Sequence, residues 1–456
     1  MTQVFIVVEC QLDYRFGWRW LLPFLKNGRL YTSGWQEGET RFLQRALTIY
    51  GVAQEGADAD IWVVNADTIG AAVHSEDLLR DGVRSVCVVG AGKNVSEWRS
   101  VLKKGFEVVQ EYGLVPSSSP RVVVPLGVPG VAEKALSIHR PGRLLGRAAV
   151  LSVKLCARLG LWRPLRRKTL LIATRNAKWQ PISAAALSSP APDVRGNYAL
   201  YLGTPEVNRK TVVLALGEGC PSGISKLAET SEAREAVLNE GTSLRELGSS
   251  LVSANIPSVH SLIVNELATS LTQEYRPRQR VVGSVFEEHV VEFLGALSLI
   301  NRGSRQLEKW IVEWPDVIQK LPEDIAREIV PAIRWLTRKA KQGVHLWEHR
   351  IHGDFAPWNC SWTSKGLFVF DWEASRCAGT AFSDAFRYVV AKELLLTRKP
   401  NPKRASSNAL NFAQRVREKT EWSHVDLDCQ FAVWAMESLG GYRPEFYVEM
   451  LNTLHD

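Results

Sequence analysis

Two short segments near the C-terminal end constrain the fold of this 456-residue chain more than any other feature. Residues 351–359 read IHGDFAPWN, and residues 367–373 read LFVFDWE. They contain Asp354, then Asn359 five positions later, and Asp371 at the end of an apolar run. Carboxylate and amide oxygens are the hard ligands that Mg²⁺ prefers. Their order and spacing, with strand-like flanks, predict that these three side chains converge on a divalent cation.

The same order of residues is typical of phosphoryl transfer from a nucleotide. In protein kinases an Asp accepts the proton of the attacking hydroxyl, and an Asn five residues on holds Mg²⁺. A second Asp, after a strand, holds Mg²⁺ on the phosphates. We therefore interpret Asp354 as the candidate catalytic base and Asn359 and Asp371 as candidate metal ligands. His352 is expected to be structural, because its ring would hydrogen-bond to backbone groups of the loop and shape it. An ordinary buried histidine of the core would do nearly the same.

The chain has the motif HGD where protein kinases have HRD, and DWE where they have DFG. These motifs resemble those of the aminoglycoside phosphotransferase and choline kinase group of kinase-like enzymes. The resemblance implies an α+β protein-kinase-like domain over residues 193–456, with a β-rich N-lobe (193–276) and a helical C-lobe (277–456). It implies ATP and Mg²⁺ as cofactors and a hydroxyl group of a small molecule as acceptor. Asp384 resembles a family position that supports the catalytic loop.

Trp372 and Glu373 stand where protein kinases have a Phe-Gly pair. This departure from the mobile switch of regulated kinases favours a constitutive enzyme. For Glu373, a further contact to metal or water and simple solvation on the surface both remain open.

Upstream of these segments, the order of elements implies nucleotide-binding residues. Lys226, on a predicted strand, matches the family lysine that contacts the α- and β-phosphates. Glu240, on a predicted helix over 231–247, matches the acidic partner that orients this lysine, and Glu235 is the competing candidate. Backbone groups near the hinge would bond the adenine at Gln273, Glu274 and Tyr275. The loop over 204–210 would cover the phosphates. This role rests only on its position in the order of elements, because the loop is not glycine-rich, and an ordinary hairpin explains it equally well.

The first 130 residues alternate between strand-like and helix-like patterns, which predicts an α/β domain. Residues 55–126 resemble the later half of a degenerate class I methyltransferase-like domain. The glycine-rich turn that would receive the cofactor is missing, and the lone Gly90-Ala91-Gly92 lacks a third glycine and an acidic residue further on. A scaffolding role is therefore favoured over a cofactor site.

The net charge of +8 is concentrated in one segment. From Lys134 to Pro192 there are twelve Lys and Arg residues and no acidic residue. We expect residues 131–192 to form a basic helical connection and linker. An amphipathic helix over 140–168 would contact an anionic membrane surface, and the alternative is a solvated helix face, which we favour. No recognised binding module accompanies the charge, so no nucleic-acid partner is expected.

The remaining composition fits a cytoplasmic protein. The seven cysteines are odd in number and none lie in a Cys-x-x-Cys pair, which argues against a disulfide framework and a zinc site. The start of the chain does not read as a signal peptide, and no stretch reaches the length of a spanning helix. Localisation in the cytoplasm, with peripheral membrane contact through 140–168, is the expectation.

Two rival functions stay open at this point. One is a pseudokinase that binds nucleotide or a partner without turnover, which the poor phosphate loop favours and the complete Asp-Asn-Asp set disfavours. The other makes the N-terminal domain the active one, as an S-adenosylmethionine-dependent methyltransferase.

Overall fold

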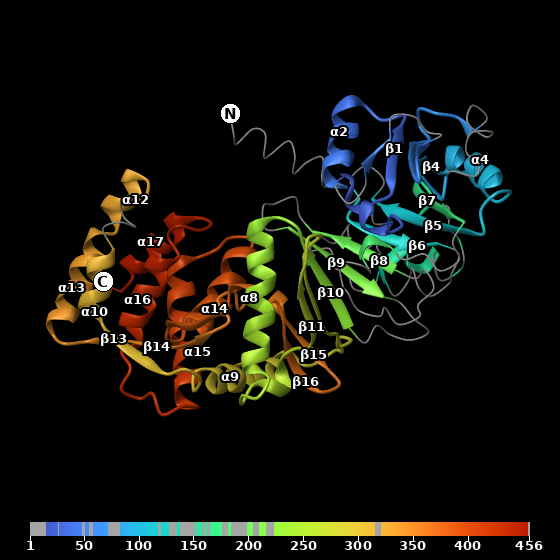
Figure 1. Cartoon of the computed structure of the whole chain (residues 1–456). Coiled ribbons are helices and arrows are strands. Elements are labelled where there is room, and N and C mark those ends of the chain that lie inside the picture. Colours follow the sequence, from blue (N-terminus) through green and yellow to red (C-terminus); the bar gives the residue numbers. More distant parts are fainter. Residues whose placement is uncertain are drawn as a thin grey trace. The chain divides into compact units, whose positions relative to one another are not determined.

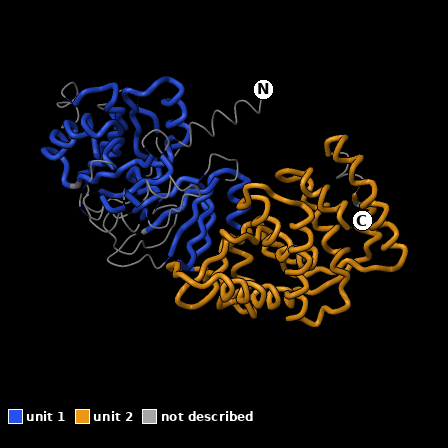
Figure 2. The backbone as a smooth tube through the Cα atoms, turned by 180° about the vertical axis from the view of Figure 1, so that it is seen from behind, with its two compact units in different colours: residues 1–238, 260–275 blue, residues 239–259, 276–456 orange. Residues whose placement is uncertain are grey.

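The computed structural model divides the chain into two compact units, which Figure 2 shows in different colours. Unit 1 contains residues 1–238 and 260–275, and unit 2 contains residues 239–259 and 276–456. The structure describes residues 15–25, 27–47, 51–53, 58–71, 83–116, 120–126, 135–136, 151–152, 154–156, 159, 161, 165–175, 181–183, 198–203, 209–215, 223–314 and 321–454.

Unit 1 is built on one mixed sheet with the strand order β11-β12-β10-β9-β8-β6-β5-β7-β4-β3-β1-β2 (Figure 1). Its helices are α2 (Glu37–Ala46), α4 (Gly92–Leu102) and the first part of α8 (Ser231–Leu247), with the short turn η1 (Gly17–Leu21). The strands are β1 (Arg29–Ser33), β2 (Gly51–Val52), β3 (Ile61–Asn65), β4 (Ser85–Ala91), β5 (Val108–Val115), β6 (Val122–Pro125), β7 (Lys168–Thr174), β8 (Tyr198–Leu202), β9 (Lys210–Ala215), β10 (Gly223–Ala228), β11 (Val259–Val264) and β12 (Thr269–Glu274).

The N-terminal part of this sheet confirms the expectation of strands that alternate with helices. Strands β2, β1, β3 and β4 run parallel, as strand-helix alternation predicts. The strand-like patterns over 106–112 and 121–124, which flank a Pro/Ser-rich turn and predict a hairpin, form the antiparallel pair β5 and β6. The methyltransferase-like character of this part stays a prediction.

Strand β7 corrects the expectation of a helical connection over 131–192. Residues 168–174 form a strand that pairs antiparallel with both β4 and β5. All of its residues after Lys168 are buried, because neighbouring strands flank it and both faces of the sheet are covered. A run such as Leu170-Leu171-Ile172-Ala173 is typical of a strand of this kind. Arg140, Arg143, Arg147, Arg158 and Arg163, which belong to the same predicted connection, lie outside the described residues.

The core of unit 1 crosses the expected boundary at residue 193. Strand β6 pairs with β8, which joins the N-terminal strands to the predicted N-lobe strands in one sheet. Buried side chains from both parts, among them Trp18, Leu170, Leu202 and Leu227, belong to one hydrophobic cluster. Since apolar area is buried across the join, the compact units do not coincide with the three expected segments.

The strands and the helix expected for the N-lobe are confirmed. The sequence pattern predicts strands over 198–203, 211–216 and 223–228, and β8, β9 and β10 begin and end within two residues of these bounds. Helix α8 matches the predicted 231–247. Strand β10 lies between β9 and β12 and is antiparallel to both. The order β12-β10-β9-β8 is therefore antiparallel, and β11 lies beyond β12 at the edge of the larger sheet (Figure 1).

The turn at Gly90-Ala91-Gly92 is already occupied by a side chain of the chain itself. The Asp67 carboxylate accepts hydrogen bonds from the backbone N–H of Ala91 at 2.7 Å and from Asn94 Nδ2 at 3.1 Å. Added Cβ atoms on Gly90 and Gly92 would lie 2.9 Å from the Cβ of Ala66 and 2.1 Å from the carbonyl oxygen of Arg166. Close packing therefore explains both glycines without a cofactor.

Unit 2 is mainly helical, as expected for the C-lobe (Figure 1). Its helices are the end of α8, α9 (Gly283–Leu297), α10 (Leu307–Glu313), α12 (Glu323–Glu328), α13 (Val330–Lys341), α14 (Ser383–Leu396), α15 (Pro402–Glu418), α16 (Leu427–Glu437) and α17 (Pro444–Asn452), with short turns η4 (Ser253–Asn255), η5 (Pro357–Asn359) and η6 (Trp372–Ala374). Its strands are β13 (Gly303–Gln306), β14 (His345–Ile351), β15 (Cys360–Thr363), β16 (Gly366–Val369) and β17 (Arg376–Thr380).

The helical patterns of the C-terminal part predict helices over 305–314, 323–341 and 429–454, and all three are shorter or divided in the structure. The first begins at Leu307, because residues 303–306 pair with β14. The second is divided into α12 and α13. The helix predicted over 429–454 is divided into α16 and α17. Gly440 and Gly441 weaken a helix between them, and Pro444 starts the second one.

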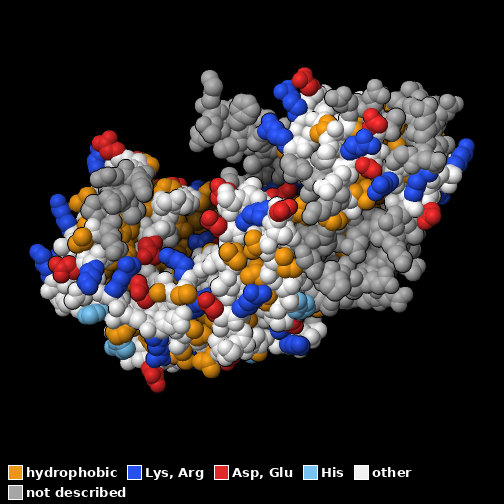
Figure 3. Space-filling view, in the orientation of Figure 1, with side chains coloured by type: hydrophobic (Ala, Val, Ile, Leu, Met, Phe, Trp, Pro, Cys, Tyr) orange, Lys and Arg blue, Asp and Glu red, His pale blue; other side chains and the backbone are white. Residues whose placement is uncertain are grey.

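The described surface carries both signs of charge and some exposed leucines. On the face shown in Figure 3, Lys and Arg side chains are interspersed with Asp and Glu side chains. In the basic segment, the exposed fractions of Leu151, Leu155 and Leu159 are 70%, 58% and 63%. No helix among the described residues combines the length and hydrophobicity needed to cross a bilayer.

Candidate active site

The loop after β14 carries His352, Gly353 and Asp354, and Asp384 at the start of α14 supports it. The Asp384 carboxylate accepts the backbone N–H of His352 at 2.6 Å and that of Gly353 at 3.0 Å. Gly353 has φ +82°, and a Cβ atom there would lie 2.1 Å from the carbonyl oxygen of Ala374. The glycine of the HGD motif therefore lets two segments of the site approach closely.

His352 is buried and joins the two motif segments. Its Nε2 lies 3.1 Å from the carbonyl oxygen of Phe370, and its Nδ1 accepts the backbone N–H of Asp354 at 3.3 Å. Its ring also packs on Trp372, with ring centroids 4.6 Å apart. The indole N–H of Trp372 donates to the carbonyl oxygen of Val369 at 3.1 Å. These contacts hold the end of β16 beside the loop.

Asp354, the candidate base, is held by donors at both carboxylate oxygens. Arg387 on α14 donates from Nε to Oδ1 at 2.9 Å and also from Nη2 to the same oxygen. Asn359 Nδ2 donates to Oδ2 at 3.1 Å and to the Asp354 carbonyl oxygen at 2.8 Å. A carboxylate offers about four acceptor sites, so the three side-chain donors still leave capacity for a substrate hydroxyl. Asp354 is half-buried, which keeps it accessible.

The second hairpin of unit 2 brings Asn359 next to Asp371. Strands β15 and β16 pair with Cys360 opposite Val369, and the backbone N–H of Phe370 donates to the Asn359 carbonyl oxygen at 3.0 Å. Because both hydrogen bonds of the amide use Nδ2, the Oδ1 atom of Asn359 is left as a ligand atom. Asp371 itself has φ +73°, a left-handed conformation that Asp adopts more readily than most residues.

Three carboxylates of unit 2 converge beside this hairpin. Glu240, Asp371 and Glu373 each place an oxygen within 4.8 Å of the other two. Glu240 is fully buried, whereas Glu235 on the same helix is exposed, and which of them has the predicted role stays a prediction. Hard oxygen donors fit Mg²⁺, and clustered carboxylates repel one another unless a cation is near. The donor set therefore fits the predicted metal.

Helix α8 is fastened to the same segment by side chains that the sequence analysis did not select. Asn239 Nδ2 donates to the carbonyl oxygens of Glu373 at 2.7 Å and Ser375 at 3.0 Å. Buried Arg350 donates to Glu246 at 2.6 Å and to Ser375 Oγ at 3.3 Å. Ser375 Oγ donates in turn to the Ile351 carbonyl oxygen at 2.8 Å. This network fixes residues 371–375 against the loop that carries Asp354.

A buried histidine and a buried cysteine next to the loop stay uncharged. Nδ1 of His349 lies 2.6 Å from the Arg350 carbonyl oxygen, and its Nε2 accepts the backbone N–H of Phe382 at 3.1 Å. Burial lowers the pKa of His349, so its ring is neutral at pH 7. Burial also raises the pKa of Cys360 far above its usual range, which leaves an unreactive thiol.

The residues predicted to bind nucleotide lie in the antiparallel part of unit 1. Lys226 is a buried residue of β10, opposite Leu271 of β12 and Val212 of β9. Gln273 is buried in β12, and Glu274 and Tyr275 are half-buried. Their roles, and the pairing of Lys226 with Glu240, stay predictions. Of the loop predicted to cover the phosphates, residues 204–208 lie outside the described residues.

Sequence reasoning missed Arg387, the residue closest to the candidate base. Its signal was weak, because it lies 33 positions after Asp354 in an ordinary helical pattern. Its position three residues after Asp384 is one turn along α14, and this spacing points both side chains toward the loop. The helix register could have selected it once Asp384 was placed.

No protein-family model and no curated protein matches the sequence. Among solved structures, a thermostable mutant of aminoglycoside phosphotransferase APH(4)-Ia is similar at 13% identity, with a TM-score of 0.40, over 56% of this chain and 93% of that one. A putative fructosamine-3-kinase from Haemophilus somnus is similar at 13% identity, with a TM-score of 0.35, over 54% and 88%. Amicoumacin kinase hAmiN, solved with AMP-PNP and Ca²⁺, is similar at 13% identity, with a TM-score of 0.33, over 54% and 84%. Each of these matches covers just over half of this chain.

Proposed function

We propose that this protein is an ATP- and Mg²⁺-dependent phosphotransferase that transfers the γ-phosphate to a hydroxyl group of a small molecule. One observation carries the proposal: the loop with Asp354 and Asn359 lies against the segment with Asp371 and Glu373. Phosphoryl transfer needs little covalent help from a protein, so positioning and charge neutralisation supply most of the rate.

In this proposal Asp354 orients the acceptor hydroxyl and takes up its proton on a carboxylate oxygen. Arg387 and Asn359 hold that carboxylate from two sides, so its orientation is set before substrate binds. Asn359 Oδ1 and Asp371 would hold Mg²⁺, with Glu240 and Glu373 close enough to contribute directly or through water. When bound, Mg²⁺ neutralises charge on the phosphate oxygens.

The direct test is a screen for ADP release. Purified protein is incubated with Mg-ATP and a panel of amino alcohols, sugars, nucleosides and hydroxy acids. We expect at least one compound to raise ADP release well above the rate with ATP alone, and mass spectrometry to find a phosphate on that compound. Nucleotide binding without turnover against the whole panel would instead favour the pseudokinase function.

Although the sequence alone favours a solvated helix face for the segment 140–168, its exposed leucines lead us to propose peripheral contact with an anionic membrane surface. Leu151, Leu155 and Leu159 recur every four residues and are exposed, within a segment free of acidic residues. Apolar side chains on one face with nearby basic residues are typical of interfacial helices. This contact would bring the enzyme to an acceptor at the membrane, but phosphoryl transfer does not depend on it.

Vesicle binding tests the membrane proposal. The protein should sediment with vesicles containing phosphatidylserine and remain in solution with neutral phosphatidylcholine vesicles, because the segment is cationic. The double substitution Leu151→Ser and Leu155→Ser should reduce the bound fraction severalfold. Leu251→Ser, which alters an equally exposed leucine outside the segment, is the matched control. Equal sedimentation with both kinds of vesicle would contradict the electrostatic contact.

A further inference from the structure

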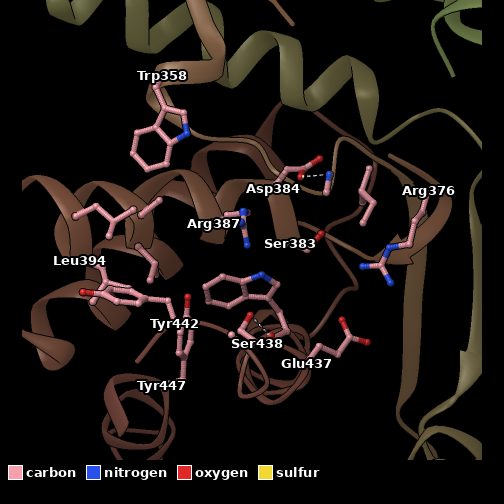
Figure 4. Close-up of a pocket in the computed structure, with 17 residues that line it drawn as sticks. Trp358, Arg376, Ser383, Asp384, Arg387, Leu394, Glu437, Ser438, Tyr442 and Tyr447 are labelled. Atoms are coloured by element: carbon pink, nitrogen blue, oxygen red, sulfur yellow. Dashed lines mark hydrogen bonds between the residues drawn. The ribbon is translucent and has the colours of Figure 1, made fainter. Parts of the chain in front are cut away.

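A cavity of about 320 Å³ opens beside the catalytic loop, within unit 2 (Figure 4). Gly353, Asp384 and Arg387 line one side of it, next to the candidate base. Its size falls at the lower end of ligand pockets, which suits a small organic molecule rather than an oligosaccharide. Since Arg387 touches both this cavity and Asp354, a molecule bound here lies next to the candidate base.

Aromatic and aliphatic side chains form much of the wall. The cavity is lined by Trp358 from η5, Leu394 from α14, Trp434 from α16, Tyr447 from α17 and Tyr442 from the turn between the last two helices. Figure 4 shows Tyr442, Tyr447 and Leu394 gathered on one side, with Trp358 above them. The exposed fractions of Trp358 and Tyr442 are 39% and 67%, although both are large apolar side chains. Such a wall is suited to a flat apolar body.

The acidic groups of the cavity already accept hydrogen bonds at both oxygens. Asp384 holds the backbone of His352 and Gly353. Glu437 accepts Trp310 Nε1 at 3.3 Å and Thr380 Oγ1 at 3.1 Å. These carboxylates therefore already hydrogen-bond to groups of the protein, and a cationic ligand would have to compete with those groups for the same oxygens.

Arg376 is the charged group of the cavity that has bonding capacity left. It is exposed at the start of β17, and no residue within 223–314 and 321–454 forms an ion pair or side-chain hydrogen bond with it. Arg387, the other guanidinium, is bonded to Asp354. A guanidinium offers five donors in a planar fork that fits a carboxylate. The unmatched charge thus favours an anion.

We propose that this cavity binds the phosphate acceptor, and that the acceptor is a hydroxyl-bearing organic acid with an aromatic or alicyclic body. Its carboxylate pairs with Arg376, its ring packs on the aromatic wall, and its hydroxyl points to Asp354. The identification of the ligand as a phosphate acceptor rests on the proposed function. The proposal that the cavity binds an organic acid rests only on the residues that line it. A polycationic acceptor is disfavoured, because Arg376 would repel it and the carboxylates of Asp384 and Glu437 already accept hydrogen bonds at both oxygens.

The test uses three probes of the same shape: 4-(hydroxymethyl)benzoate, its neutral amide and the corresponding benzylamine. Binding to the full-length protein is measured by ligand-observed NMR without nucleotide. The acid should bind about five- to tenfold more tightly than the amide, and the amine more weakly than both. Arg376→Gln should remove the preference for the acid and leave the amide unchanged. Arg327→Gln, an exposed arginine of α12 outside the cavity, is the control.

The results separate the two proposals. Tighter binding of the acid that depends on Arg376 supports the site, even if no phosphate is transferred to this probe. Equal binding of acid and amide, tighter binding of the amine, no binding of the acid, or an unchanged preference in Arg376→Gln would overturn it. ADP release with other hydroxyl compounds would then still support the phosphotransferase. Loss of ADP release against all compounds, with acid binding intact, would overturn only the phosphotransferase.

Discussion

Asp354→Ala is expected to lower the rate of Mg-ATP-dependent phosphoryl transfer by about 10²–10⁴-fold, the usual contribution of a general base. The variant loses the group that orients the acceptor hydroxyl, and it leaves Arg387 and Asn359 without their shared partner. The measurement is ADP release with the acceptor that the screen identifies, at saturating nucleotide.

Two controls make this result specific. Asp354→Asn keeps the size of the side chain and removes its charge, so it should lose most of the rate while unfolding at nearly the same temperature. Asp324→Ala changes an acidic residue in the first turn of α12, far along the chain from the loop, and should keep full activity. A rate in Asp354→Ala equal to that of the unaltered protein would rule out the assigned base.

Asp371→Asn is expected to weaken Mg²⁺ binding at least tenfold and to lower phosphoryl transfer accordingly. The substitution removes one of three carboxylates whose oxygens lie within 4.8 Å of one another. Asn is the suitable replacement because it tolerates the left-handed backbone at this position, where alanine would add strain. The loss is thus assigned to charge and not to the backbone.

Thermal unfolding gives a readout of this site that does not require activity. A ligand at 100 times its dissociation constant stabilises the folded state by about 2.7 kcal/mol, so Mg²⁺ should raise the melting temperature of the unaltered protein by several degrees. Asp371→Asn should abolish most of this rise, while the control Asp426→Asn, outside the cluster, should preserve it. An equal rise with Mg²⁺ in Asp371→Asn would show that the cation binds elsewhere.

The motif residues were predictable because their chemistry is local. Asp354 and Asn359 lie in one loop and hydrogen-bond directly, so their spacing in the chain already implies contact. Strand β10 and helix α8 were equally predictable from the sequence, since each has its own periodic pattern and polar residues mark its ends. Where a pattern is complete within one element, the sequence is sufficient.

Strand β7 and residue Arg387 were not predictable in the same way. Residues 168–174 follow a basic segment, and their burial depends on pairing with β4 and β5, which lie far away in the chain. Arg387 acquires its role only because α14 packs beside the loop and Asp384 fixes its start. Neither fact is encoded in the spacing of neighbouring residues.

The sequence by itself determined the chemistry available: three carboxylates, an amide and a histidine in two short segments, followed by helices. The tertiary structure alone decided which groups meet them. It placed Glu240 and Glu373 beside Asp371, Arg387 on Asp354, and Arg376 in a cavity with an aromatic wall. The reason is physical, because hydrogen bonding within a loop depends on neighbours in the chain, whereas charge clustering and cavities depend on how distant helices pack.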